Sequence, residues 1–350
     1  MNKIRLAVIF GGNSTEYGVS LQSSFSVLKN LKADRYDVFP IGITREGEWY
    51  HYTGRYENIN DNSWFEDREN LFPVIFSPNK ASGGFIEAVN GECQKISVDL
   101  VFPVLHGKNG EDGTVQGMCE LAGIPVVGCS TLSSALCMDK DRAHKLVEAA
   151  GIAVPKSVAF RLANRKEALE RIVKEFAPPL FVKPVRAGSS FGISRITEFA
   201  ELDKAVDEAF SHDSEVIVEE NIDGFEVGCA VMGIDSLTVG RVDEIELSKG
   251  FFDFTEKYTL KSSRIHMPAR IDEAKEKQIQ ETAKTIYRAL GCSGFARVDM
   301  FLTASGEIVF NEVNTIPGFT SHSRYPNMMK GIGMSFTRML DRLIGLYAKR

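Results

Sequence analysis

Hydrophobic and polar positions predict alternating strands and helices over the first 128 residues. Residues 4–10 (IRLAVIF) form a continuous apolar run typical of a buried strand, and helical periodicity runs from about Glu16 to Leu31 after the tight loop GGNS. Strands and helices that alternate in this way indicate an α/β unit. The other strand-like runs are YDVFPIGI, VDLVFPVLHG and IPVVG, with a helical stretch at about 112–122. The polar segment from about 45 to 97 shows no clear pattern.

Beyond Gly128 the same pattern continues in two further segments. Helical stretches at 130–150, 165–176 and 198–210 surround the strand-like runs IAVPKSVAF, PPLFVKP and EVIVEENI. The remainder alternates strands with helices, the longest at 272–290. A chain of 350 residues has room for two or three such domains.

Residues 297–314 (RVDMFLTASGEIVFNEVN) predict a hairpin with a polar face. Two apolar-rich runs flank Ser305-Gly306, which suits a two-residue turn, and this register places Asp299 opposite Glu312 and Arg297 opposite Asn314. Strand side chains alternate faces and cross-strand partners share one, so all four side chains should point the same way.

Two carboxylates and an amide oxygen held together repel one another unless a hard cation lies among them. Mg²⁺, bound by a few protein oxygens and by nucleotide phosphates, meets that need. Arg297 beside them would hold an anion. The alternative for this hairpin is a surface ribbon with a solvated, charged face.

Composition limits the classes of function. The chain has 350 residues and a net charge of −6, which argues against bulk binding to nucleic acid or to an anionic membrane. No apolar run approaches the roughly 20 residues that cross a bilayer, and the N-terminus lacks a signal-peptide cleavage site. We expect a cytoplasmic protein. Six cysteines lie scattered without C-x-x-C spacing, which suggests reduced, buried thiols.

Three glycine-rich segments could hold small ligands. GGNSTEYGVS follows a strand but lacks the G-x-G-x-x-G spacing, so NAD binding is disfavoured; Glu16 in it could complement a helix dipole or receive a substrate ammonium. HGKNGEDGTVQG places His106 and Glu111 at the carboxyl end of a sheet, where α/β folds bind ligands, although a lone histidine is more often structural.

The third segment, FVKPVRAGSSFG, carries Lys183 on a strand and then Ser189 and Ser190 in a flexible loop. Backbone amides freed by its glycines can wrap phosphates, though the loop is not a Walker A motif and a plain turn is the alternative. Lys140 in MDKDR adds a second cation for a polyphosphate, and VIVEENIDGFEVGCAV supplies two carboxylates, Glu219 and Glu226, for adenine and ribose edges.

Taken together, these motifs resemble one family. GGNSTEYGVS, LHGKNGEDG, MDKDR, FVKPVRAGSSFG, VEENIDGFEVG, FFDFTEKY, ARVD and FNEVNTIPGFTSHSRYP, in that order, are similar to the D-alanine:D-alanine ligase family of the ATP-grasp superfamily. The resemblance runs nearly end to end. It is strongest to the glycopeptide-resistance ligases of the VanG type, which join D-alanine to D-serine. It implies three domains: a Rossmann-like α/β domain at residues 1–128, and two α+β ATP-grasp subdomains at residues 129–221 and 222–350.

The resemblance also implies roles for individual residues. Glu16 would bind the ammonium of the first D-alanine with His106 nearby, and Arg297 and the amide of Gly318 would stabilise developing negative charge. Tyr258 in the closing loop would hydrogen-bond Ser189. The magnesium ligands would be Asp299, Glu312 and Asn314. The ATP-binding residues would be Lys140, Lys183, Ser190, Glu219, Ile222, Glu226 and Lys257.

Recognition of the second substrate is expected to depend on the segment TSHSRYP. Arg324 follows Ser323 where ordinary family members usually carry an apolar residue, and a guanidinium can donate to a serine hydroxyl. Phe252 stands where tyrosine is common, and Asp243 would orient the arginine. The alternative for Arg324 is a rim charge held by a neighbouring acid.

We therefore expect an ATP-dependent D-alanine:D-serine ligase that makes peptidoglycan precursors and confers vancomycin resistance. It would use two magnesium ions, for which manganese can substitute, and form a homodimer. The alternatives are a D-alanine:D-alanine ligase of ordinary cell-wall synthesis, an NAD-dependent oxidoreductase and a catalytically dead ATP-binding scaffold.

Overall fold

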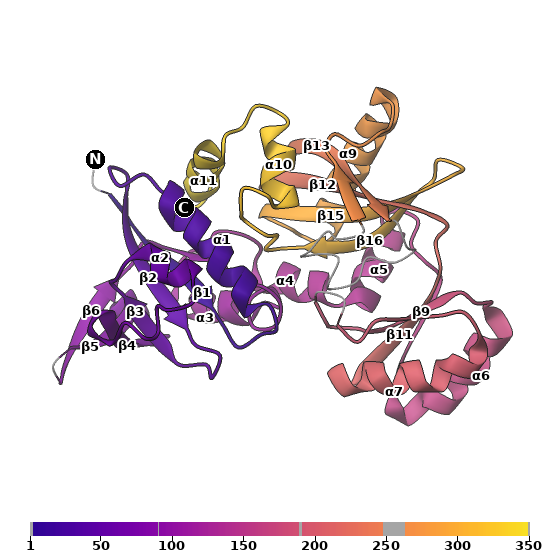
Figure 1. Ribbon diagram of the computed structural model, residues 1–350, viewed down its shortest axis with the longest axis horizontal. Coiled ribbons are helices and arrows are strands. Elements are labelled where there is room, and N and C mark those ends of the chain that lie inside the picture. Colours follow the sequence, from indigo (N-terminus) through magenta and orange to yellow (C-terminus); the bar gives the residue numbers. More distant parts are fainter. Residues whose placement is uncertain (1–2, 90, 189–190, 248–262, 349–350) are drawn as a thin grey trace.

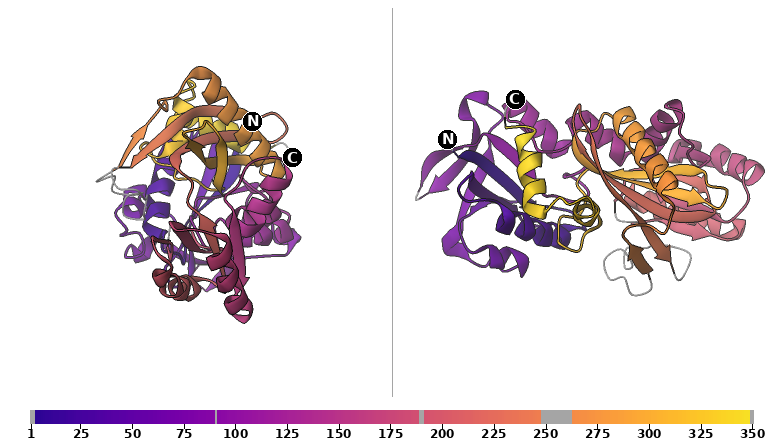
Figure 2. Two further views of the ribbon diagram at one scale, coloured as in Figure 1. Left: turned by 90° about the vertical axis from the view of Figure 1, so that its right-hand side faces the viewer. Right: turned by 90° about the horizontal axis from the view of Figure 1, so that it is seen from above.

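The structure is a computed structural model that describes residues 3–89, 91–188, 191–247 and 263–348. The described strands form three sheets of seven, four and five strands, which lie in three regions of an elongated molecule (Figure 1). Viewed from above, the C-terminal helix lies between the region of the first sheet and that of the third (Figure 2). No helix within these residues combines the length and apolarity needed to cross a bilayer.

The first sheet is mixed and has the strand order β6-β5-β4-β3-β2-β1-β7. Its strands are β1 (Ile4–Gly11), β2 (Tyr36–Ile43), β3 (Trp49–Tyr52), β4 (Leu71–Phe76), β5 (Gly84–Val89), β6 (Glu92–Ser97) and β7 (Leu100–Pro103). β1 pairs in parallel with β2 and β7, and the other pairs are antiparallel. The segment from 45 to 97 thus adds four strands and the short helix α2 (Tyr56–Asn60) to the sheet.

Helices cover both faces of this sheet around β1. Leu6 and Val8 share a core with α1 (Tyr17–Asn30), whereas Ala7 and Ile9 share another with α3 (Thr114–Ala122). Because both faces are buried, the residues from Leu6 to Phe10 are all apolar rather than alternating. The predicted strand at 124–128 is wrong, since Val126 forms only an isolated bridge to Val101.

The second sheet is antiparallel with the order β10-β9-β11-β8. Its strands are β8 (Ser157–Arg161), β9 (Leu180–Pro184), β10 (Ser194–Ile196) and β11 (Glu215–Glu220). Two helices, α6 (Arg165–Glu175) and α7 (Leu202–His212), pack on its outer side and share its core (Figure 1). The helices α4 (Thr131–Met138) and α5 (Lys140–Ala149) precede this sheet in the chain.

The third sheet is also antiparallel and has the order β14-β13-β12-β15-β16. Its strands are β12 (Gly224–Gly233), β13 (Thr238–Leu247), β14 (Ser263–His266), β15 (Gly294–Thr303) and β16 (Ile308–Asn314). Val298 and Met300 share a core with α9 (Glu273–Ala289). Residues Arg297 and Asp299 alternate with them and face the opposite side.

The hairpin β15–β16 has the expected pairs but not the expected turn. Arg297 pairs with Asn314 and Asp299 with Glu312, as predicted. The two-residue turn is wrong: Thr303 accepts from Gly306 N and donates to the carbonyl of Glu307, so the loop has three residues and ends on Gly306 at φ 83°. The register then shifts by one residue between Asp299 and Met300. This β-bulge compensates for the longer loop.

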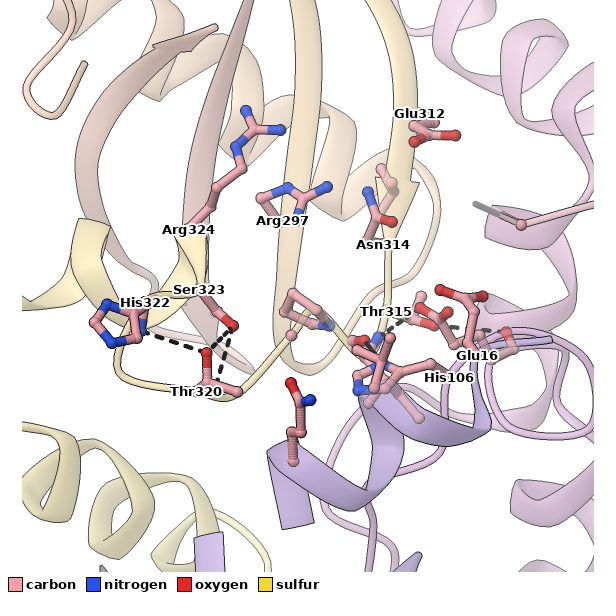
Figure 3. A pocket seen from close by; sticks show the side chains of 18 of the residues that line it. Glu16, His106, Arg297, Glu312, Asn314, Thr315, Thr320, His322, Ser323 and Arg324 are labelled. Carbon is pink, nitrogen blue, oxygen red and sulfur yellow. Dashed lines mark hydrogen bonds between the residues drawn. The ribbon is translucent and has the colours of Figure 1, made fainter. Parts of the chain in front are cut away.

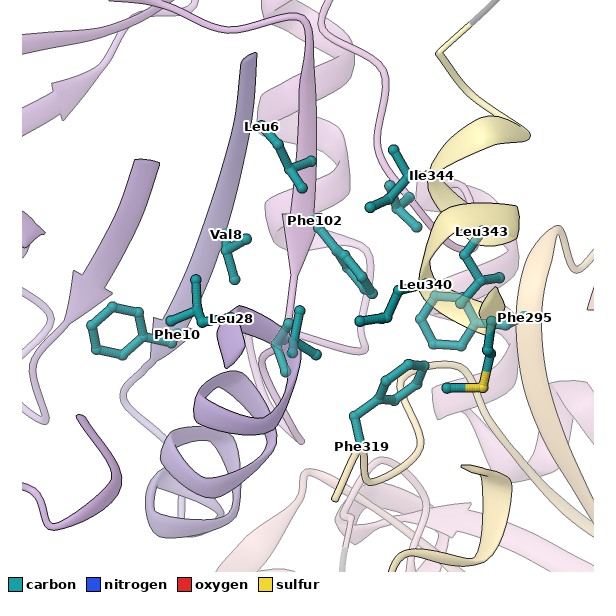
Figure 4. Close-up of a cluster of buried hydrophobic side chains, with 14 of the residues drawn as sticks. Leu6, Val8, Phe10, Leu28, Phe102, Phe295, Phe319, Leu340, Leu343 and Ile344 are labelled. Atoms are coloured by element: carbon teal, nitrogen blue, oxygen red, sulfur yellow. The ribbon is translucent and has the colours of Figure 1, made fainter. Parts of the chain in front are cut away.

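The last two helices join the regions of the first and third sheets. They are α10 (Arg324–Lys330) and α11 (Phe336–Gly345). Leu340 and Leu343 of α11 share one buried cluster with Leu6, Phe102 and Phe319 (Figure 4). The C-terminal helix therefore packs against the N-terminal sheet, and the domain boundaries at 128/129 and 221/222 stay a prediction.

Candidate active site

A cleft of about 510 Å³ lies between the first and third sheets (Figure 3). It brings together nine of the predicted site residues: Glu16, His106, Lys140, Arg297, Glu312, Asn314, Gly318, Ser323 and Arg324. Five others lie outside the described residues: Ser189, Ser190, Phe252, Lys257 and Tyr258. The remaining ones are not among the residues that line the cleft: Lys183, Glu219, Ile222, Glu226, Asp243 and Asp299.

The face of the β15–β16 hairpin carries the candidate metal ligands. Asp299 is 1% exposed, and its carboxylate accepts from Arg297 Nη2 at 2.6 Å and from Asn314 Nδ2 at 2.9 Å. The amide oxygen of Asn314 remains an acceptor, and Glu312 lies two residues away on the same strand. Two carboxylates and an amide oxygen are ligands that suit Mg²⁺. No group of three or more His, Cys, Asp or Glu side chains in the described parts of the chain could hold a metal, so phosphates or water would complete this site.

Arg324 is buried among acids rather than on the rim of the cleft. Its Nε and Nη2 donate to the two oxygens of Asp243, each at 2.8 Å, and Nη1 donates to Glu226 at 2.8 Å. Its side chain is only 8% exposed. Asp243 thus contacts the arginine as expected, and its role in orienting Arg324 for the second substrate stays a prediction. A guanidinium has five N–H donors. Three form these bonds, Nη2 also lies 3.4 Å from Asp299 Oδ1, and one N–H of Nη1 remains.

Gly228 of β12 provides the room for this pair, and the sequence analysis missed it. Its N–H donates to Asp243 Oδ1 at 3.1 Å, and a Cβ there would lie 2.3 Å from Arg324 Nη2 and 2.7 Å from Asp243 Oδ1. Such contacts force the guanidinium to move. The contact between Arg324 and Asp243 therefore requires glycine at position 228.

We expect Gly228→Ala to lower kcat/KM for D-serine, the second substrate expected from the sequence, about tenfold. Stability should fall by about 1–3 kcal/mol, the usual effect of overpacking. Steady-state kinetics and urea unfolding measure the two effects. Gly345→Ala is the matched control, because a Cβ at Gly345 meets no atom within 4 Å. Unchanged D-serine kinetics in Gly228→Ala would contradict this role.

Three side chains from the first 111 residues hold the segment that carries Gly318. The ring of His106 contacts the carbonyl of Ile316 through Nδ1 at 2.8 Å and Ser23 Oγ through Nε2 at 3.0 Å. Ser23 Oγ also accepts from Phe319 N, and Glu111 accepts from Ile316 N at 3.0 Å. Both ring nitrogens of His106 are thus engaged by the protein. Its predicted role in substrate binding stays a prediction.

The Glu111 carboxyl group should make stability depend on pH. Burial, together with the nearby Glu16 and Glu312 carboxylates, raises the pKa of Glu111 to about 8. Between its ordinary pKa and this value the folded state holds a proton that the unfolded chain loses. The group's contribution is therefore complete at low pH and is lost as pH rises towards 8.

We expect the unfolding free energy of the wild type to fall relative to Glu111→Gln between pH 5.5 and 8.5, by at most about 1.4 kcal/mol per pH unit. Urea unfolding of both proteins across this range measures the difference. Parallel stability curves would contradict the raised pKa.

Two lysines and a buried glutamate lie near the second sheet. Lys183 Nζ donates to Glu219 Oε2 at 2.5 Å, and Lys140 Nζ donates to the carbonyl of Ala187 at 2.9 Å. Burial raises the pKa of Glu219, but Lys183 and His144 outweigh this effect and the pKa lies below its ordinary value. The charged carboxylate of Glu219 and the ammonium groups of Lys183 and Lys140 thus lie near the second sheet.

Comparison with known proteins decides the family. The model of the D-ala D-ala ligase N-terminus matches residues 5–129, and that of the C-terminus matches residues 146–345. The chain belongs to the D-alanine:D-alanine ligase family. It is an enzyme of the ATP-dependent ligase class, with small-molecule amino acids as substrates.

Several relatives of this ligase cover almost its whole length. A crystal structure of the VanG D-Ala:D-Ser ligase from Enterococcus faecalis is 70% identical with a TM-score of 0.94, and the match covers 99% of this chain and 100% of that one. The vancomycin C-type resistance protein VanC1 of Enterococcus gallinarum is 45% identical over 98% of both chains. The D-alanine–D-alanine ligase of Caldicellulosiruptor bescii is 42% identical over 99% of this chain and 95% of its own.

Proposed function

We propose that this ligase joins D-alanine to D-serine and so supplies a peptidoglycan precursor that vancomycin binds poorly. The observation that carries the proposal is the buried Arg324–Asp243 pair, of which Arg324 lines the cleft and keeps an N–H of Nη1 outside its bonds to Asp243 and Glu226. A serine hydroxyl can accept such a bond, whereas the methyl group of alanine cannot. The similarity to the VanG D-Ala:D-Ser ligase supports the same substrate.

The reaction has two steps. The carboxylate of D-alanine attacks the γ-phosphate of ATP and forms an acyl phosphate and ADP; the amine of D-serine then attacks the acyl carbon, and phosphate leaves. Glu16 at the start of α1 would bind the first ammonium. Arg297 and the amide of Gly318 would stabilise the negative charge that develops on the acyl oxygen. Ser190 and Lys257, which lie outside the described residues, would close over the γ-phosphate. Tyr258 would hydrogen-bond Ser189 and so help to exclude water.

Asp299, Glu312 and Asn314 would hold magnesium, which neutralises phosphate charge during phosphoryl transfer. Their chemistry fits a hard cation, and two ions, or manganese in their place, belong to the proposal. Lys140, Lys183 and Ser190 would contact the phosphates. Glu219, Glu226 and the backbone at Ile222 would meet the base and ribose.

The test is ATP-dependent phosphate release with D-alanine and a panel of second amino acids. We expect D-serine to accelerate release more than D-alanine does. Phosphate release that D-serine does not accelerate would overturn the assignment of D-serine as the second substrate.

The second candidate is a D-alanine:D-alanine ligase. Its support is that three of the five donors of Arg324 are already committed to acids, which limits what the residue can offer a hydroxyl. The Caldicellulosiruptor bescii relative carries this activity in its name. In this case D-alanine would be the better second substrate in the release assay. A cytoplasmic homodimer completes the proposal, and size-exclusion chromatography with light scattering tests the dimer.

A further inference from the structure

His144 of α5 lies between two parts of the proposed site without lining the cleft. It is 4% exposed, and its ring packs edge-on against Phe310 with centroids 5.6 Å apart. Its Nε2 lies 3.3 Å from the carbonyl oxygen of Asn311, and its Nδ1 lies 3.9 Å from Glu219 Oε1. One ring therefore touches the strand of the metal-binding Glu312 and the carboxylate proposed to meet the base of ATP.

The surroundings define the proton on this ring. A carbonyl oxygen only accepts, so Nε2 carries the hydrogen. Burial lowers the pKa of His144 and outweighs the opposite effect of Glu219, which keeps the ring neutral. Nδ1 is then an acceptor that faces another acceptor, Glu219 Oε1, and neither atom has a hydrogen-bond partner among the described residues. Buried acceptors of this kind are costly unless a donor reaches them.

The hydrogen bond from His144 Nε2 goes to the carbonyl oxygen of Asn311, the extra residue of the β-bulge in β16. Near the turn, Met300 pairs with Phe310. If this register continued along the strands, Asn311 would lie opposite Asp299. Glu312 would then point to the face of α9, because a shift of one residue exchanges the faces of a strand. The bulge restores Glu312 to the side of Asp299, and His144 binds the carbonyl of the bulged residue.

The pair of acceptors suits an amino group. Glu219 Oε1 and His144 Nδ1 are 3.9 Å apart, close enough for one –NH₂ group to donate to both. Adenine carries such a group, whereas hypoxanthine has a carbonyl oxygen at the same position. An acceptor placed against two buried acceptors is strongly disfavoured.

We propose that His144 is a positioning and specificity residue with two separable contacts. Nε2 fixes the bulge that turns Glu312 towards Asp299, and Nδ1 completes with Glu219 a paired acceptor for the amino group of adenine. The inference rests on the proposed function and adds to it a residue that sets both the metal site and the choice of base.

Two variants separate the contacts. His144→Gln places an amide nitrogen near the position of Nε2 and keeps the bond to Asn311 while Nδ1 is lost. His144→Asn places its amide near Nδ1 and loses the bond to the bulge. His212→Gln, on the partly exposed surface of α7, is the control for histidine replacement. Thermal unfolding of each variant checks that it is folded.

Two measurements report the two contacts. Mn²⁺ binding in the presence of a non-hydrolysable ATP analogue, followed by electron paramagnetic resonance, reports the metal site without turnover. Competitive binding of ATP and inosine triphosphate by calorimetry reports the choice of base. We expect His144→Asn to weaken Mn²⁺ binding about tenfold with its base preference kept, and His144→Gln to lose about tenfold in preference for ATP with Mn²⁺ binding kept.

The proposal is overturned if both variants keep wild-type Mn²⁺ affinity and base preference. It is also overturned if both variants lose the two properties equally, because a merely structural role of His144 gives that result. Failure of the proposed function would be seen elsewhere, as a wild-type protein that binds nucleotide and metal but forms no dipeptide.

Discussion

Glu312→Ala is expected to lower kcat/KM by at least about 10³-fold, the upper range for the loss of one electrostatic stabiliser. Glu312 lines the cleft beside Asn314 and pairs with Asp299 across the hairpin. In the proposed metal site, its removal would leave one carboxylate and one amide to hold Mg²⁺, and the charge of the transferring phosphoryl group would be poorly neutralised. Steady-state kinetics over a range of Mg²⁺ concentrations measures the effect.

The matched control for this variant is Glu307→Ala, an exposed glutamate at the turn of the same hairpin. We expect it to change activity by less than twofold, because exposed substitutions away from such features usually shift stability by at most about 0.5 kcal/mol. Near-normal turnover of Glu312→Ala at ordinary Mg²⁺ concentrations would be incompatible with a metal ligand at this position.

Arg324→Leu is expected to lose about 3–5 kcal/mol of stability. It removes the cation that pairs with the fully buried carboxylate of Asp243 and with the carboxylate of Glu226. The protein that still folds should favour D-alanine over D-serine, with the ratio of the two kcat/KM values shifted about tenfold or more. Urea unfolding and kinetics with each second substrate measure the two effects.

Arg324→Lys separates charge from geometry. It keeps the positive charge near Asp243 but loses the two parallel bonds of the guanidinium. We expect a smaller loss of stability and nearly the same loss of D-serine preference. If Arg324→Lys and Arg324→Leu both retain the wild-type preference, the arginine plays no part in choosing the second substrate.

The sequence was sufficient for the parts of the fold that follow from local patterns. The run IRLAVIF became β1, and the polar positions of residues 297–314 became a hairpin whose cross-strand pairs are those expected. The face formed by Arg297, Asp299 and Asn314 could be predicted because strand side chains alternate with period two.

Features that depend on tertiary contacts could not be predicted in this way. The expected two-residue turn and the observed three-residue turn with a bulge give the same pairs at Asp299, so the pattern alone does not distinguish them. Nothing local marks Ser23 as the partner of His106, or Gly228 as the neighbour of Arg324, because these partners lie 83 and 96 residues apart. The segment from 45 to 97 lacked a clear pattern in part because β6 is mostly exposed, with only Ile96 buried.

The most direct test gives the purified ligase D-alanine labelled with ¹³C, equal unlabelled D-serine and ATP with Mg²⁺, and identifies the dipeptide by mass spectrometry. The account predicts labelled D-alanyl-D-serine as the main product, with ADP and phosphate in equal amounts and no product in EDTA. A product that is mainly D-alanyl-D-alanine would contradict the assigned specificity, and dipeptide formation that persists in EDTA would contradict the metal-dependent reaction.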